Sequence, residues 1–156
     1  MSHFSRIRTK ISNRKALVNG LERLGLKAEV HETPTQLINT WGDKDFAEVI
    51  VRRSEFSLGD NLCRADLGFR LNTETQSYEA VFDQHEFRNT ILKEKFASYT
   101  NFVAQLQCAY EIENVLLLYP ASQYNISEPV LTEDGSYTLE ITEKVDPFSL
   151  QVGAGY

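Results

Sequence analysis

The fold is decided by residues 67–82, which read LGFRLNTETQSYEAVF. Apolar side chains occupy every second position in each half of this stretch. They are Leu67, Phe69 and Leu71, followed by Tyr78, Ala80 and Phe82. A period of two is typical of half-buried strands, and the polar residues between the two halves are turn formers. The stretch therefore predicts a β-hairpin with one buried face.

Three further alternating segments precede this hairpin, and each predicts a strand. They are residues 3–11, 27–32 and 47–52. Thr33-Pro34 should end the second strand, because proline cannot donate a hydrogen bond to the ladder. Residues 34–45 then form a loop that contains Trp41.

A helix is predicted between the first two strands. Residues 13–24 carry leucines at helical spacing, and either Ser12 or Asn13 can cap the first turn with its side-chain oxygen. Gly20 lies inside this helix, where glycine costs about 1 kcal/mol relative to alanine. Its small size suggests that another element packs closely against it.

In the second half of the chain, the spacing of apolar residues changes from the period of a strand to that of a helix. Residues 86–113 predict a long aromatic-rich helix with a break near Thr100-Asn101. The apolar run Val115–Tyr119 fits a helix or a buried strand equally well. Asp134-Gly135 between two short strand-like segments predicts a second hairpin over residues 130–142.

Together these elements predict an α+β fold. Their order is β-α-β-β-β-β-α-β-β, and few of the connections suit parallel crossovers. We expect a mostly antiparallel sheet with two helices packed on one face, a ferredoxin-like variant. The chain has 156 residues, of which 42% are hydrophobic and 24% are charged, as in globular domains. We expect one domain over residues 1–142 and a flexible tail over residues 143–156.

Charge is distributed unevenly along the chain. The net charge of −6 divides into +5 for residues 1–30, −4 for residues 31–95 and −7 for residues 96–156. This pattern fits an ordinary solvated surface, or a field that steers a partner toward one end of the molecule. A basic segment on an acidic protein is weak evidence for nucleic acid, which usually binds a basic domain with clustered lysines and arginines. We therefore expect a protein partner, with nucleic-acid binding through the first strand as a third hypothesis.

Motifs for catalysis or cofactor binding are absent. Neither the phosphate-binding G-x-x-x-x-G-K-[ST] pattern nor the zinc-binding H-E-x-x-H pattern occurs, and the three histidines are scattered. Cys63 and Cys108 are too far apart for a metal pair and suit a reducing compartment. No apolar run approaches the length of a membrane span, and no secretory signal is visible. We expect no cofactor and no metal, and we favour a role outside catalysis.

Two groups of side chains are candidates for function. Arg6, Arg8 and Lys10 share the outer face of the first strand and, with Trp41, form a candidate partner-binding surface. Asp66, Glu79 and Asp83 form a candidate acidic cluster. Paired carboxylates bind cations or act as acid and base, so an acidic cleft for a small ligand or substrate is the alternative function. These carboxylates equally fit the solvent face of a hairpin, paired with Arg52 or Arg70.

Several motifs resemble the hypothetical chloroplast open reading frame 35 family, a domain of unknown function. The opening residues 1–11 are similar to the N-terminal signature of that family. Further matches are Asp66-Leu67-Gly68-Phe69, Tyr78-Glu79 with Asp83, and Asp134-Gly135-Ser136. The acidic C-terminal end departs from the basic ending that is usual in the family.

The resemblance carries expectations about role and location. Proteins of this family occur in cyanobacteria, plastid genomes and some phages, and they have been linked to photosystem I assembly or maintenance. The family has no established catalytic residues. The resemblance thus implies a soluble cytoplasmic or stromal factor that binds another protein.

Overall fold

The computed structural model describes residues 4–40, 42–56, 64–83, 86–89, 91–134 and 137–145. The chain divides into two compact units, Met1–Glu113 and Asn114–Tyr156. The elements that begin in the first unit are β1 (Phe4–Arg8), α1 (Arg14–Arg23), β2 (Glu29–Gln36), β3 (Phe46–Val51), the 3-10 turn η1 (Arg53–Glu55), β4 (Leu67–Asn72), β5 (Ser77–Asp83), α2 (Glu86–Asn89), α3 (Ile91–Phe96) and α4 (Tyr99–Leu118). The second unit contains β6 (Tyr124–Ile126), β7 (Val130–Leu131), β8 (Tyr137–Thr138) and β9 (Ile141–Glu143). A single domain over residues 1–142 stays a prediction.

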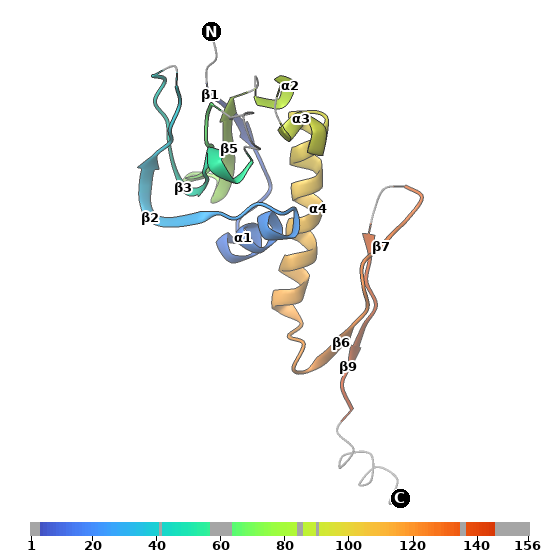
Figure 1. Cartoon of the computed structure of the whole chain (residues 1–156). Helices are drawn as coiled ribbons and strands as arrows, with labels where there is room; N and C mark the ends of the chain where they lie inside the picture. The colour runs from blue at the N-terminus through green and yellow to red at the C-terminus, as the bar shows by residue number, and fades with distance from the viewer. Residues whose placement is uncertain are drawn as a thin grey trace, which may run out of the picture. The chain divides into compact units, whose positions relative to one another are not determined.

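A five-stranded sheet in the order β1-β5-β4-β3-β2 forms the centre of the first unit, and all its strand pairs are antiparallel (Figure 1). The predicted hairpin lies in the middle, where β4 and β5 pair from Gly68 and Val81 to Asn72 and Ser77. Helices α1 and α4 lie on one side of the sheet (Figure 1). The α+β class, with a mostly antiparallel sheet and helices on one face, is confirmed.

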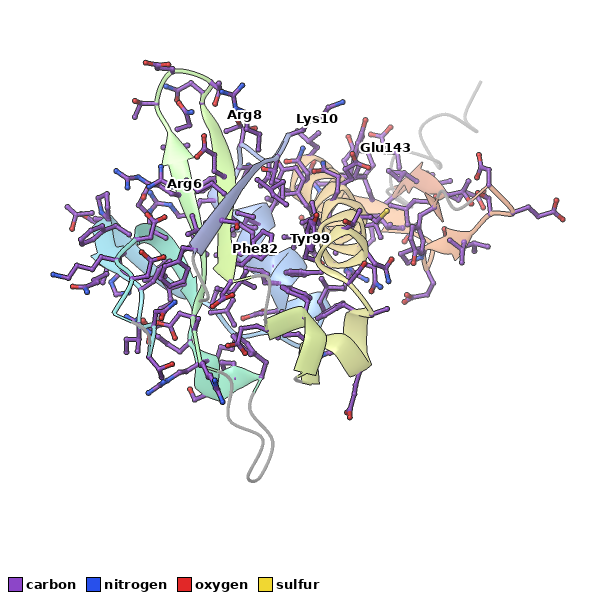
Figure 2. The ribbon with its side chains drawn as sticks, turned by 90° about the horizontal axis from the view of Figure 1, so that it is seen from above. Arg6, Arg8, Lys10, Phe82, Tyr99 and Glu143 are labelled. Atoms are coloured by element: carbon purple, nitrogen blue, oxygen red, sulfur yellow. The ribbon has the colours of Figure 1, made fainter. Side chains whose placement is uncertain are left out.

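Aromatic rings join the sheet to the long helix. The Phe82 ring of β5 lies 5.4 Å from the Tyr99 ring of α4, measured between centroids (Figure 2). Phe82 also meets Phe87 at 5.7 Å, and Phe87 in turn meets Phe102 at 5.7 Å. Because rings at this spacing attract each other beyond their buried area, the end of β5 is held firmly against the start of α4.

Part of the opposite face of the sheet is buried as well. A small second core consists of Leu37, Ala47, Ile50 and Val81, with Phe4 packed against it. Gly68 lies directly under this core. A Cβ atom at Gly68 would stand 2.8 Å from the Ala47 Cβ atom and 2.9 Å from the Leu37 methyl carbons. Glycine is therefore required at this position of the Asp-Leu-Gly-Phe motif, because any side chain would push the second core away.

Strand β2 is longer than predicted. It runs through Pro34 to Gln36, whereas the sequence predicted that Thr33-Pro34 would end it. Two features make the proline tolerable. β2 is an edge strand, and its pairing with β3 is irregular between Val30 and Thr35, so no ladder bond is required from Pro34.

The predicted long helix is three helices, and its main break lies earlier than predicted. Ala97 has a positive φ of 66°, and Ser98 begins α4 by accepting a hydrogen bond from the Asn101 backbone N–H at 3.2 Å. The Asn101 side chain donates to the Phe96 carbonyl oxygen at 2.7 Å and holds this corner. At the other end, α4 continues to Leu118, so most of the apolar run that starts at Val115 is helical.

Helix α1 begins as the sequence predicts. The Asn13 side chain accepts a hydrogen bond from the Ala16 backbone N–H at 3.1 Å, which identifies Asn13 as the cap. The Tyr110 hydroxyl of α4 accepts from the backbone N–H groups of Ser12 at 3.2 Å and of Asn13 at 3.1 Å. Burial raises the pKa of Tyr110, but these hydrogen bonds outweigh burial and the net pKa is lowered.

The second unit is built around a two-stranded arm. β6 pairs with β9, and β7 pairs with β8, so the predicted hairpin is confirmed over residues 130–138. Gly135 and Ser136 of its predicted turn lie outside the described residues. The Ser127 backbone N–H donates to the Glu140 carbonyl oxygen at 2.9 Å and continues the ribbon between the two strand pairs.

A substitution at Gly20 tests the packing of α1 on α4. A Cβ atom there would lie 3.1 Å from the Tyr110 backbone nitrogen, so the two helix backbones touch. We expect Gly20→Leu to lower the free energy of unfolding by about 2 kcal/mol, because the helices must separate. Glu22→Leu, at an exposed position of the same helix, should change it by less than about 0.5 kcal/mol. Urea denaturation measures both, and equal losses would contradict the close approach.

Candidate functional site

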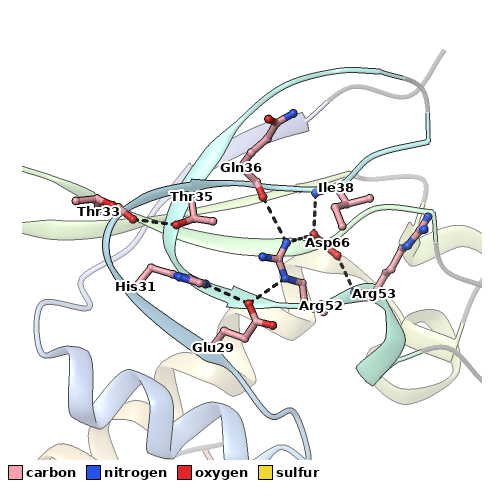
Figure 3. Close-up of polar contacts among 9 residues, drawn as sticks. All are labelled: Glu29, His31, Thr33, Thr35, Gln36, Ile38, Arg52, Arg53 and Asp66. Carbon is pink, nitrogen blue, oxygen red and sulfur yellow. Dashed lines mark hydrogen bonds and ion pairs between the residues drawn. The ribbon is translucent and has the colours of Figure 1, made fainter.

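Asp66, the first member of the predicted acidic cluster, is completely buried. Its carboxylate accepts hydrogen bonds from the Ile38 backbone N–H at 2.7 Å, the Arg53 backbone N–H at 2.8 Å and the Arg52 Nη1 atom at 2.8 Å (Figure 3). A buried carboxylate is stable only when it is paired and hydrogen-bonded in this way. The contacts of Asp66 are those of a structural anchor, and they leave little capacity for a ligand.

Arg52 extends this network to the surface. Its Nε atom donates to Glu29 Oε2 at 3.0 Å, and the His31 ring nitrogen lies 3.1 Å from the same oxygen (Figure 3). The hydrogen bond from His31 and the contacts of Arg52 lower the pKa of Glu29. Burial lowers the pKa of Arg52, but its bonds to Asp66 and Glu29 outweigh burial and raise it. Both groups therefore stay charged across the neutral range.

The other two predicted acidic residues have different surroundings. Glu79 is partly exposed, pairs in register with Arg8 and Arg70, and accepts a hydrogen bond from the Asn72 side chain at 3.0 Å. Asp83 is buried at the end of β5. Asp83 lies four residue steps beyond Glu79, which is about 13 Å along an extended chain. Within the described residues, no group of three or more His, Cys, Asp or Glu side chains is placed to hold a metal ion.

The basic strand face divides into two parts. Arg6 is bound within the fold, since its guanidinium makes two hydrogen bonds to Asp45, at 2.7 and 3.1 Å. These bonds and the Asp45 charge raise the pKa of Arg6 despite some burial. Arg8 and Lys10 are exposed and have no ion-pair partner among the described residues (Figure 2). Only these two remain available to a partner.

Trp41, the other member of the predicted partner-binding surface, lies outside the described residues. The same holds for His3, Cys63 and His85. Cys108 is partly buried on α4, and His31 belongs to the Arg52 network.

Sequence reasoning missed two surface features. One is the exposure of the apolar side chains Val130, Leu131 and Tyr137 on the hairpin arm, residues 124–143, where the sequence predicted the hairpin but no apolar surface. A two-stranded ribbon cannot bury such side chains by itself. Apolar residues within the predicted hairpin were therefore the signal that the sequence offered. The other is a pocket of about 630 Å³ between α1, β2 and the β4–β5 hairpin, called here the α1 pocket. It arises from tertiary packing, and no sequence pattern marks it.

None of the helices in the described part of the chain has the length and hydrophobicity that crossing a bilayer requires.

The structural role of Asp66 can be tested by comparing substitutions at Asp66 and Glu79, because both were candidates for an acidic site. We expect Asp66→Asn to lower the free energy of unfolding by about 3 kcal/mol, because Arg52 loses its buried partner and one acceptor becomes a donor. Glu79→Gln keeps an acceptor for Asn72 and should cost less than about 0.5 kcal/mol. Chemical denaturation measures both values. A small cost for Asp66→Asn would contradict its structural role.

The comparisons with known proteins identify one family. A family model described as a protein of unknown function (DUF1257) matches residues 20–140, which includes most of the sheet, α4 and most of the hairpin arm. Neither the curated proteins nor the solved structures contain a match to this chain. Because the matched region covers well over half of the sequence, the chain belongs to this family of proteins of unknown function.

Proposed function

We propose that this protein is a non-enzymatic interaction or assembly factor and that the hairpin arm is its main contact with a partner protein. The observation that carries the proposal is the exposure of apolar side chains on a two-stranded ribbon. Val130 is 60% exposed, Leu131 61% and Tyr137 45%. Exposed apolar side chains in such a cluster mark interaction sites.

The arm presents these side chains in a defined arrangement. Leu131 and Tyr137 are directly paired across β7 and β8, so they share one face of the ribbon, while Val130 pairs with Thr138 on the other face. At the base of the arm, the Tyr119 and Tyr124 rings meet edge to face at 5.2 Å. A rigid base with an apolar pair farther along suits an element that inserts into a groove of another protein.

Charge indicates the chemistry of the partner. Residues 124–143 contain five acidic residues and no lysine or arginine. They are Glu128, Glu133, Asp134, Glu140 and Glu143. The complementary partner is a protein with an apolar groove and a basic rim, and the opposite charges would speed their encounter.

The basic strand offers a second contact. Arg8 and Lys10 are exposed and lack ion-pair partners among the described residues, so they suit an acidic region of the partner. We leave Arg6 out of this surface because it binds Asp45. The resemblance in the opening residues and motifs supports a role in assembling or maintaining photosystem I, in the cytoplasm of a cyanobacterium or the plastid stroma. An acidic cleft at Asp66, Glu79 and Asp83 is less favoured, since Asp66 is fully engaged.

Affinity capture of the tagged full chain from the lysate of its own cells, with cross-linking and mass spectrometry, tests this function. We expect one stoichiometric protein partner, with cross-links adjoining the hairpin arm. The double substitution Leu131→Ser and Tyr137→Ser should reduce its recovery about tenfold, because the apolar pair is the anchor.

A matched control keeps the test specific. Ile38→Ser also replaces an exposed apolar side chain, 48% exposed, but in the first unit, and should leave recovery unchanged. Arg8→Glu with Lys10→Glu measures the second contact separately. The absence of any partner from the wild-type capture would refute the interaction function. Undiminished recovery by the hairpin variant would refute the assignment to the arm.

A further inference from the structure

The α1 pocket has the size of a small-molecule site. Its volume of about 630 Å³ falls within the roughly 300–1,000 Å³ that ligand pockets usually occupy. Its walls come from the first two turns of α1, from β2 and from the β4–β5 hairpin, all within the first unit. None of the residues that line the pocket belongs to the hairpin arm or to the Asp66 network, so the pocket can be tested independently of the proposed function.

Apolar side chains line part of the pocket. Val18 of α1 and Leu71 of β4 are half-buried, and the Tyr78 ring of β5 is buried behind them. Val30 of β2 also lines the pocket and is 46% exposed, which is high for a valine beside a concave surface. A ligand with an apolar body would cover these side chains and remove them from water.

Two cations lie beside this apolar surface, and none of the described residues that line the pocket is acidic. Arg14 and Lys15 are both exposed. Arg14 uses only its Nε atom within the fold, donating to the Tyr78 hydroxyl at 3.3 Å. Within the described residues, nothing accepts a hydrogen bond from the Arg14 Nη atoms or from Lys15 Nζ. The hydrogen bond with Tyr78, followed by the smaller effects of the Glu48 and Glu32 charges, raises the pKa of Arg14.

Tyr78 adds a third donor. Its oxygen accepts from Arg14, so the hydroxyl keeps its own hydrogen for another acceptor, and the described residues provide none. Three backbone N–H groups at the helix start already have partners and lie outside this donor set. Those of Ser12 and Asn13 donate to Tyr110, and that of Ala16 donates to Asn13.

We propose that the α1 pocket binds a small organic anion. Its acidic headgroup, a carboxylate, sulfonate or phosphate, contacts Arg14, Lys15 and the Tyr78 hydroxyl, and its apolar body lies on Val18, Val30 and Leu71. The chemistry requires both parts. Inorganic phosphate would lack the apolar contacts, and a neutral apolar molecule would leave the cations unpaired.

Fluorescence titration of the full chain with three probes tests the proposal. The probes are 1-anilinonaphthalene-8-sulfonate, its neutral counterpart N-phenyl-1-naphthylamine, and inorganic phosphate as a competitor. We expect the sulfonate to bind at one site and more tightly than the neutral compound, with weak competition by phosphate. Arg14→Gln with Lys15→Gln should weaken sulfonate binding about fivefold and leave binding of the neutral probe unchanged. Val30→Asp should weaken the binding of both aromatic probes.

Charge-matched variants complete the test. Lys10→Gln with Lys27→Gln removes two exposed cations that do not line the pocket, and it should leave sulfonate binding unchanged. Equal weakening by both double variants would show only a general charge effect and overturn the proposal. The proposal also fails if the sulfonate does not bind, or if Val30→Asp has no effect. Loss of the protein partner by the hairpin variant would have no bearing on these results.

Discussion

The buried carboxylate of Asp66 is the interaction on which the rest of the first unit depends. A charge removed from water must be matched by donors, and Asp66 finds its three in Ile38, Arg52 and Arg53. These donors come from the β2–β3 connection and from the chain just after β3. Fixing Ile38 also places Leu37 over Gly68, which closes the second core. The Asp66 carboxylate thus holds the β2–β3 connection in place and, through Leu37, contributes to the burial of the second core.

This arrangement determines which side chains remain for partners. Asp66 and Arg6 are bound within the fold, so two of the seven residues that looked functional stabilise the structure instead. The side chains left over are the exposed cations of β1 and α1 and the apolar residues of the hairpin arm. The carboxylates around those apolar residues give the arm a charge opposite to that of the α1 pocket. The two proposed binding surfaces therefore consist of different residues and carry opposite charge.

Local patterns predicted the parts of the fold that depend on local physics. Alternation over residues 67–82 predicted β4 and β5, and the polar residues before α1 included its cap, Asn13. The prediction that Pro34 ends β2 was wrong. The free-energy cost of a proline in a strand depends on whether that strand lies at the edge of the sheet, and only the assembled sheet decides this. The burial of Asp66 and the α1 pocket escaped for a related reason. Both arise where segments far apart in sequence meet. In the sequence, a carboxylate or an arginine that stabilises the fold cannot be distinguished from one that contacts a ligand.

Hydrogen exchange followed by mass spectrometry tests the central claim most directly. The full chain would be compared alone and bound to the partner that it captures. Partner binding through the hairpin arm predicts that the backbone amides of residues 124–143 exchange more slowly in the complex. The exposed side chains there, Leu131 and Tyr137, would then lie within the protected segment. Protection confined to the sheet and α1, with the arm exchanging as fast as in the free protein, would contradict the account.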